Sequence, residues 1–417
     1  MLLIYTPITT SRISYIMQIM IGDLLQAEYS ITNDLADFLQ YEGVKFSYSN
    51  EEAGELHFGS MGLLQETGIV SQDLSVVTWQ EYKLFFPVSK GVLPFDPFAV
   101  AFYLITRYEE YYPEMPKDEH GRYMVTESIA YKNGFHRKPM VNMIACEIGK
   151  MLKALFPDFT LPTLSSTILR TYDVDIAYQY KGKTPFRFVG SLVKSLLQFD
   201  FQKAGKLMLT LFGKEVVDDF DTFALYKERA LSEHQSPIHF ILTAPFGKFD
   251  RNISYKSEAF KRLIQYLSEF SEIGLHPSYP SSRALSLIGQ EKQRLEKICG
   301  YKVVKSRQHF LRFTFPDTFV RLIADGFTDD YSLGWTNEVG FRASISIPFP
   351  FYDLHKEQKT SLILHSLHTM DAALNRLTTS KEDQKRIIDD LIAEIKQYGG
   401  EFVMLEHNSF SPLPLLF

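Results

Sequence analysis

Cysteine is scarce in this chain, with only Cys146 and Cys299 among 417 residues. Both lie in patterns that predict helices. The sequence therefore lacks both the paired cysteines of a disulfide framework and the clustered ligands of a thiolate zinc site. A reducing compartment is the simplest interpretation, so we expect a cytoplasmic protein.

Long apolar runs, basic blocks, internal repeats and low-complexity tracts are also lacking. The most apolar stretch near the N-terminus, residues 13–25, is interrupted by Gln18 and Asp23 and falls short of the ~18 apolar residues that a membrane span needs. The formal net charge is −6. We therefore expect neither a membrane span nor a nucleic-acid partner.

The length of the chain predicts two domains, because 417 residues exceed a typical single core. Residues 157–163 contain two prolines after a helical pattern and mark the boundary. We predict a smaller mixed α+β accessory domain over residues 1–160 and a larger α/β domain over residues 161–417.

The predicted N-terminal domain contains a strong helical pattern over residues 95–112, with Asp96 as N-cap and Pro97 at the first helical position. It is rich in aromatic residues and shows no catalytic constellation. We interpret it as a support or a lid that shapes a substrate groove.

The predicted C-terminal domain alternates short apolar strands with helical patterns, including a mostly helical insertion around residues 180–235. Thr379 and Glu382 have the spacing of a capping box before the last helix. This alternation predicts a distorted (β/α) barrel of about seven or eight strands. The strand candidates are residues 167–173, 238–243, 273–276, 303–310, 331–335, 341–347, 362–367 and 402–405.

Two aspartates end the first strand of this predicted barrel. Asp173 and Asp175 are two positions apart, so their side chains share one face of the strand. Catalytic residues of such barrels lie at the carboxyl ends of strands. One carboxylate can bind a metal while the other acts as a base, although the pattern also fits a turn or helix cap with two solvated aspartates.

Later strands place further polar side chains at the same edge. His276 ends the third strand and precedes a rigid proline turn, which suits a metal ligand as well as a structural histidine. Arg307 and His309 share a face of the fourth predicted strand. Arg307 can hold an aspartate in place while His309 binds a metal. Alternatively, Arg307 forms a surface ion pair and His309 is a packed structural residue.

The remaining candidates come from the fifth and last strands. Asp330 can pair with Arg307, and Trp335 can line a sugar pocket. His407 is a candidate general acid or base because an imidazole pKa lies near working pH. Each of these signals alone is weak, but their order along the strands is rarely produced by chance.

This order resembles the polysaccharide deacetylase family, carbohydrate esterase family 4, over about residues 165–417. The resemblance implies a distorted barrel that binds a divalent metal, usually zinc. It implies that Asp173 is the catalytic base and that Asp175 and His276 are metal ligands. It also implies that Arg307 orients the base and that His407 is the general acid.

The chain departs from the family pattern at the second metal histidine, which normally follows the first by four residues. Pro280 occupies that position and cannot ligate. Either another residue substitutes, for which we choose His309, or the site binds metal poorly. His309 itself stands where the family usually has a proline.

A narrower resemblance involves residues 274–279 (GLHPSY), 306–311 (SRQHFL) and 340–343 (GFRA). These phrases, together with residues 95–122, resemble deacetylase-like proteins of Bacteroidetes polysaccharide gene clusters, which carry an extra N-terminal domain. From this resemblance we expect contacts to substrate from four side chains: Tyr279, Asp330, Trp335 and Arg342.

The sequence therefore predicts a metal-dependent hydrolase that removes acetyl groups from a carbohydrate. Two alternatives remain open at this point. A catalytically degenerate barrel would act as a glycan-binding or scaffold protein, and the missing second histidine is its main support. A barrel hydrolase acting on a non-sugar amide would use the same bond-breaking groups.

Overall fold

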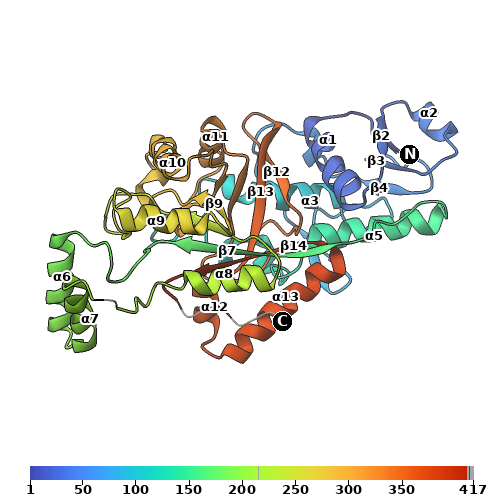
Figure 1. Ribbon diagram of the computed structural model, residues 1–417. Helices are drawn as coiled ribbons and strands as arrows, with labels where there is room; N and C mark the ends of the chain where they lie inside the picture. The colour runs from blue at the N-terminus through green and yellow to red at the C-terminus, as the bar shows by residue number, and fades with distance from the viewer. Residues whose placement is uncertain (215, 411–412, 414–417) are drawn as a thin grey trace.

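The computed structural model describes residues 1–214, 216–410 and 413 (Figure 1). Its N-terminal part contains a four-stranded parallel sheet with the strand order β2-β1-β3-β4 and a separate antiparallel pair, β5 and β6. The strands are β1 Leu2–Tyr5, β2 Tyr29–Thr32, β3 Lys45–Ser49, β4 His57–Gly59, β5 Val76–Trp79 and β6 Tyr82–Phe85.

Helix α3 (Pro97–Ile105) is the centre of the N-terminal part, and all of its residues are buried. Asp96 caps it as predicted, because its carboxylate accepts hydrogen bonds from the backbone N–H groups of Phe98 and Ala99. The predicted helix over residues 95–112 was too long. Arg107 adopts a left-handed conformation with φ 55°, and a separate 3-10 turn follows at Tyr108–Tyr111.

The other N-terminal helices surround this centre. Helix α1 (Ser11–Met17) continues directly into a π-helix at Gln18–Leu24. The remaining helices are α2 Leu35–Gln40, α4 Ile129–Lys132 and α5 Met140–Leu155.

The C-terminal part is a closed barrel of seven parallel strands, which confirms the predicted fold class. The strand order is β11-β10-β9-β8-β7-β14-β13, and pairing of β11 with β13 closes the barrel. One antiparallel strand, β12, pairs with β13 outside this ring. The strands are β7 Ser166–Val174, β8 Ile238–Ile241, β9 Glu272–Leu275, β10 Lys305–Ser306, β11 Asp329–Leu333, β12 Phe349–Asp353, β13 Gln358–Met370 and β14 Gly400–His407.

Helices connect most of the barrel strands and cover them from outside. Figure 1 shows α6 and α7, which lie between β7 and β8, together at one end of the molecule. The last long helix, α13, is capped by Ser380 and not by Thr379, because the Ser380 hydroxyl accepts the N–H of Asp383. The helices are α6 Pro185–Leu197, α7 Phe201–Leu211, α8 Phe223–Ser232, α9 Glu258–Leu267, α10 Ser286–Cys299, α11 Asp317–Ala324, α12 Asp371–Leu377 and α13 Lys381–Tyr398.

The strand predicted at residues 341–347 is wrong. This segment is irregular, and its backbone bonds to the N-terminal part: Phe341 N–H donates to His136 O, and Ser344 O accepts from Val141 N–H. Gly340 permits the approach, with φ 124° and no room for a side chain against the His136 carbonyl. The alternating apolar residues there reflect packing between the two parts of the chain.

The fourth predicted strand, residues 303–310, is much shorter than expected. Only Lys305 and Ser306 pair as strand β10, and His309 lies in a 3-10 turn, His309–Leu311. Arg307 and His309 therefore do not share a strand face. The prediction that they lie together rested on that shared face.

The two parts of the chain share one continuous apolar core that joins α1 and α3 to β12 and β13. In the described part of the chain, no helix connects β11 to β13 along the sequence. In place of such a helix, the rings of Tyr15 and Phe102 pack on Tyr352 of β12, with centroid separations of 4.8 and 5.3 Å. The buried Arg12 binds Glu357 through two of its nitrogens, at 2.9 and 2.5 Å.

We also compared the helices with the dimensions of a bilayer. Among the described residues, no helix combines the length and the apolar character that crossing a membrane requires.

Candidate metal centre and catalytic groups

The carboxyl ends of the barrel strands bring together most of the predicted site residues. Asp175 follows the last residue of β7, His276 follows β9 and Arg307 follows β10. His407 ends β14, and the sheet register sets it opposite Asp173 of β7. Since parallel strands of a barrel all end at one face, these side chains converge there.

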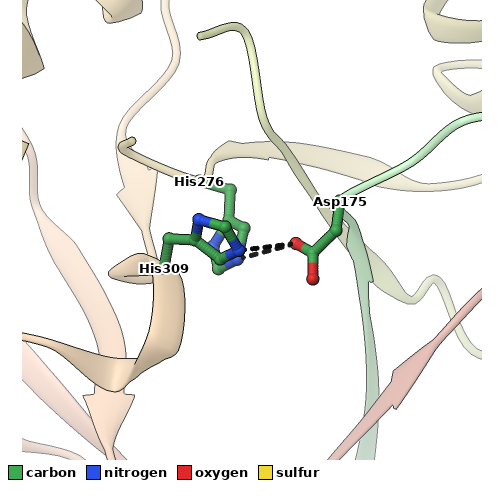
Figure 2. A group of neighbouring side chains, drawn as sticks. All are labelled: Asp175, His276 and His309. Atoms are coloured by element: carbon green, nitrogen blue, oxygen red, sulfur yellow. Dashed lines mark ion pairs between the residues drawn. The ribbon is translucent and has the colours of Figure 1, made fainter. Parts of the chain in front are cut away.

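Asp175, His276 and His309 form a compact group of three possible metal ligands (Figure 2). The Oδ1 atom of Asp175 lies 3.2 Å from Nε2 of His276 and 3.5 Å from Nε2 of His309. Donors that lie about 2.0–2.1 Å from a tetrahedral zinc are separated by roughly 3.3 Å. The two measured separations match that spacing.

The outer nitrogen of each histidine already has a partner. Nδ1 of His276 donates to the backbone carbonyl of Arg307 at 2.5 Å, and Nδ1 of His309 faces Oδ1 of Asp250 at 2.9 Å. Such partners fix the ring orientation of metal-binding histidines and leave Nε2 as the ligand. The buried Oδ1 atom of Asp175 has no hydrogen-bond partner of its own among the described residues. This donor set therefore fits a divalent metal.

The electrostatics of the three side chains show how strongly they attract a cation. Burial alone would raise the pKa of Asp175, but His309 and His276 outweigh it and hold that pKa well below its usual value. Burial opposes the charge on His309, but Asp175 and Asp250 raise the pKa of this imidazole to about 9. In the metal-free site a proton on His309 neutralises the carboxylates, so a metal has to displace that proton.

Asp173 lies beside the histidines and is held from the other side by Arg307. Nη1 of Arg307 lies 3.1 Å from Oδ1 of Asp173 and 2.7 Å from Oγ1 of Thr171. Oδ2 of Asp173 is 3.5 Å from Nε2 of His276. The guanidinium is fully buried, and its Nε donates to the carbonyl of Tyr331, so Asp173 has a fixed orientation.

His407 completes the group on the opposite side. Its Nδ1 atom lies 2.7 Å from Oδ1 of Asp371, and its Nε2 atom points towards Asp175, with 3.9 Å to Oδ2. Burial opposes a charge on His407, but Asp371, followed by Asp175 and Asp173, raises its pKa to about 10. The imidazole is therefore protonated at neutral pH and can donate a proton from Nε2.

The loop that carries His309 is fixed by the N-terminal part of the chain. Phe310 adopts a left-handed conformation with φ 63°, which is uncommon for an aromatic residue. Nη1 of Arg122 donates to the Phe310 carbonyl at 2.9 Å. Nδ1 of His120 lies 3.1 Å from the Tyr279 hydroxyl. The polar turn near residue 120 thus supports the site, although it supplies none of the converging groups.

The four residues predicted to contact substrate have different surroundings. Tyr279 is half-buried at the site, where its ring packs on Phe249 at a centroid separation of 4.1 Å. Asp330 is fully buried and accepts hydrogen bonds from Ser306 and Ser332. It makes no hydrogen bond to Arg307, contrary to the predicted pairing.

Trp335 and Arg342 lie in the interior between the two parts of the chain. Arg342 binds Glu110 through two nitrogens, at 3.0 and 2.6 Å, and its guanidinium lies 4.7 Å from the Trp335 ring. Both side chains are buried. Their role in sugar binding stays a prediction, and the structure gives them a role in joining the two parts.

Two carboxylates of the site were missed by the sequence interpretation. Asp371 directly follows β13, so its place at the end of a strand was a signal that could have been found. Asp250 lies in the irregular loop after β8, and no motif marks it. Its contact with His309 depends on tertiary structure alone.

Comparison with known proteins adds a family match and several structural neighbours. Residues 2–157 match a family model described as a family of unknown function, DUF7033. No curated protein matches the chain. The chain is similar to solved structures, including a Mycobacterium smegmatis protein described as a polysaccharide deacetylase, at 12% identity and a TM-score of 0.39, over 62% of this chain and 82% of that one.

Two further neighbours carry similar descriptions. One is a Bordetella bronchiseptica protein described as a polysaccharide deacetylase involved in O-antigen biosynthesis, at 12% identity, a TM-score of 0.30, and 58% and 71% coverage. The other is a polysaccharide deacetylase of Bacillus cereus, at 9% identity, a TM-score of 0.25, and 59% and 80% coverage. Values of this size do not by themselves assign an activity to this chain.

Proposed function

We propose that this protein is a metal-dependent hydrolase that removes acetyl groups from a carbohydrate. The observation that carries the proposal is the group formed by Asp175, His276 and His309. The outer nitrogens of both histidines are occupied, and three donors converge at the spacing of a zinc site. Two nitrogens and one oxygen suit zinc better than magnesium or calcium, which prefer oxygen ligands.

A divalent metal held by these three side chains would supply Lewis acidity for an acetyl carbonyl and for the attacking water. In the proposed reaction, Asp173 accepts the proton of that water at Oδ2, while Arg307 holds Oδ1. His407 donates a proton from Nε2 to the leaving amine or alkoxide, and Asp371 stabilises its charged form.

A carbohydrate substrate is proposed from the family resemblance of the motifs and from the aromatic residues beside the site. Tyr279, Phe249 and Phe310 pack together next to His309, with centroid separations between 4.1 and 5.6 Å. Half-buried aromatic rings of this kind are suited to stacking against sugar rings. Kinship with the Bacteroidetes subgroup stays a prediction.

The test is the metal content of the purified full chain beside its deacetylase activity. We expect about one zinc per chain in the wild type, loss of that zinc in Asp175→Ala and His309→Ala, and retention in His355→Ala, which replaces an exposed histidine outside the site. Deacetylase activity on acetylated oligosaccharides should be retained in the proteins that bind zinc and lost in the variants that do not.

The main alternative is a degenerate barrel that binds glycans without hydrolysis, and Pro280 at the usual ligand position is its support. Absence of zinc from the wild type, even after zinc is added, would exclude the proposed chemistry in favour of that alternative. Zinc with hydrolysis of acetylated peptides only would instead indicate a non-sugar amide as the substrate.

A further inference from the structure

Helix α6 leaves most of its apolar side chains exposed to solvent, and only Phe188 and Leu192 among its large apolar residues are half-buried. Arg187, Ser191 and Ser195, spaced four residues apart, are half-buried or buried. The opposite face carries the exposed side chains Phe186, Val189, Val193 and Leu197, and Phe186 is 88% exposed. An ordinary surface helix directs its main apolar stripe towards the core, whereas the most exposed face of α6 is apolar.

Helix α7 and its flanking residues also expose large apolar side chains, including Phe201 and Leu211 of the helix itself. Phe199, in the turn between the two helices, is 79% exposed, and Phe212, just after α7, is 72% exposed. Twelve of the thirty large apolar side chains that are exposed in the described part of the chain lie within residues 186–217. Such a concentration of exposed apolar side chains in one segment marks an interaction surface, because scattered single residues are what a monomeric protein normally exposes.

A basic cleft lies beside this apolar face. It has a volume of about 690 Å³ and is lined by aromatic side chains and by six cations: Lys183, Arg187, Lys194, Lys203, Lys248 and Arg251. Lys181 and Lys206 on the same segment pair with Asp221 and Asp219, whereas among the described residues none of the six cations forms an ion pair. Burial, followed by the charges of Arg187 and Lys203, lowers the pKa of Lys183 to about 8. Within the described part of the chain, the cleft therefore carries six cationic side chains without a salt-bridge partner.

The cleft adjoins the candidate metal centre. Ile176, which lines it, is the residue after Asp175, and Lys248 and Arg251 flank Asp250. A ligand that fills the cleft would therefore lie near the mouth of the barrel.

We propose that the α6–α7 hairpin and its basic cleft bind the surface of an anionic lipid bilayer. The exposed face would enter the boundary between headgroups and acyl chains, and the six cations would contact lipid phosphates. Charge complementarity selects this partner over a second copy of the chain, because pairing two hairpins would bring their unpaired cations together. The inference does not depend on the proposed hydrolase chemistry.

The experiment is cosedimentation of the full chain with vesicles of phosphatidylcholine, alone or with roughly one-third phosphatidylglycerol. We expect binding to the anionic vesicles only, weakening as salt is added. Phe199→Ser with Phe212→Ser, and separately Lys194→Glu with Lys203→Glu, should each lower the partition coefficient about tenfold or more.

Two matched controls replace residues far from the hairpin. Leu35→Ser with Leu39→Ser removes two exposed leucines of α2, at the opposite end of the molecule in Figure 1. Lys83→Glu with Lys396→Glu makes the same change in net charge. Both should bind like the wild type. Equal partitioning of all five proteins, or no binding by the wild type, would overturn the proposal. The proposal would also be overturned if the wild type formed a dimer that did not bind vesicles and that the phenylalanine substitutions dissociated.

Discussion

Asp371 is bound to His407 at two points. Its Oδ1 atom lies 2.7 Å from Nδ1 of the imidazole, and its Oδ2 atom accepts the backbone N–H of His407 at 2.6 Å. Asp371 begins α12 and His407 ends β14, so the carboxylate fixes both the ring and the strand end that carries it. A single buried side chain thereby sets the position and the charge of the proposed general acid.

Asp371→Asn is expected to lower activity by removing this charge. The pKa of His407 is raised to about 10, and Asp371 is the largest cause that raises it. A general acid must be protonated, so activity falls as pH rises through its pKa. In the variant, the loss of activity at high pH should begin at a lower pH, and kcat should drop about tenfold or more. Both effects are measured by recording kcat and kcat/KM as a function of pH. An unchanged pH profile would contradict the assignment, and Asp390→Asn on the surface of α13 is the control.

The zinc affinity of the metal centre is expected to rise with pH below pH 9. Asp175 and Asp250 overcome burial and raise the pKa of His309 to about 9, so the metal-free site carries a proton there at neutral pH. Zinc binding has to release that proton. The apparent affinity should therefore increase by about tenfold per pH unit between pH 6 and 8, as measured by competition with a chelator of known affinity. An affinity independent of pH would show that zinc binding displaces no proton from His309.

Asp250→Ala is expected to weaken zinc binding without removing a ligand. Asp250 contacts Nδ1 of His309 and also accepts the backbone N–H of Tyr279 at 2.9 Å. Loss of such an outer partner typically weakens metal binding by about 10- to 100-fold. Zinc titration of this variant should give a dissociation constant raised by that factor. Asp158→Ala, at an exposed position, should bind zinc as the wild type does.

Arg307→Lys is expected to lower activity while zinc remains bound. The guanidinium reaches Thr171, Asp173 and the carbonyl of Tyr331 at once, and an ammonium group cannot reproduce this planar set of donors. Misplacement of Asp173 should lower kcat/KM by about 100-fold. Unchanged metal content separates this effect from loss of the metal centre, whereas full activity would rule out a positioning role for Arg307.

Arg12→Met is expected to destabilise the whole chain. Arg12 is fully buried, and its loss leaves Glu357 without its cation at the junction of the two parts. Breaking a fully buried pair on one side costs about 3–5 kcal/mol, and we expect the lower end of that range here because Glu357 is 19% exposed. The urea midpoint should fall accordingly, and adding Glu357→Gln should recover part of the loss. Equal midpoints for Arg12→Met and the wild type would mean that the junction does not depend on this pair.

The sequence predicted the barrel and the Asp173–Asp175 pair because both follow from local periodicity. Strand alternation with helices is a local pattern, and it places both aspartates at the carboxyl end of the first strand, although Asp175 lies one residue beyond β7 and not on its face. His276 and His407 were found for the same reason, since each lies at the end of a strand.

The other parts of the site and the path of residues 341–347 could not be predicted because they depend on tertiary contacts. His309 reaches the centre from a 3-10 turn and not from the strand face on which its prediction rested. Asp250 bonds His309 across 59 residues of sequence, a contact that no spacing rule encodes. Residues 341–347 alternate like a strand, but their backbone partners lie in the N-terminal part, so the pattern had a different cause.

The junction between α1 and β12 also sets an order of events during synthesis. Tyr15 and Arg12 complete their packing on Tyr352 and Glu357, which leave the ribosome more than three hundred residues later. Until then Arg12 lacks its carboxylate partner and the Tyr15 ring lacks its cover, and transiently exposed apolar surface of this kind is what chaperones protect. We therefore expect a chain truncated after α5 to keep these rings uncovered and to aggregate more readily than the full chain.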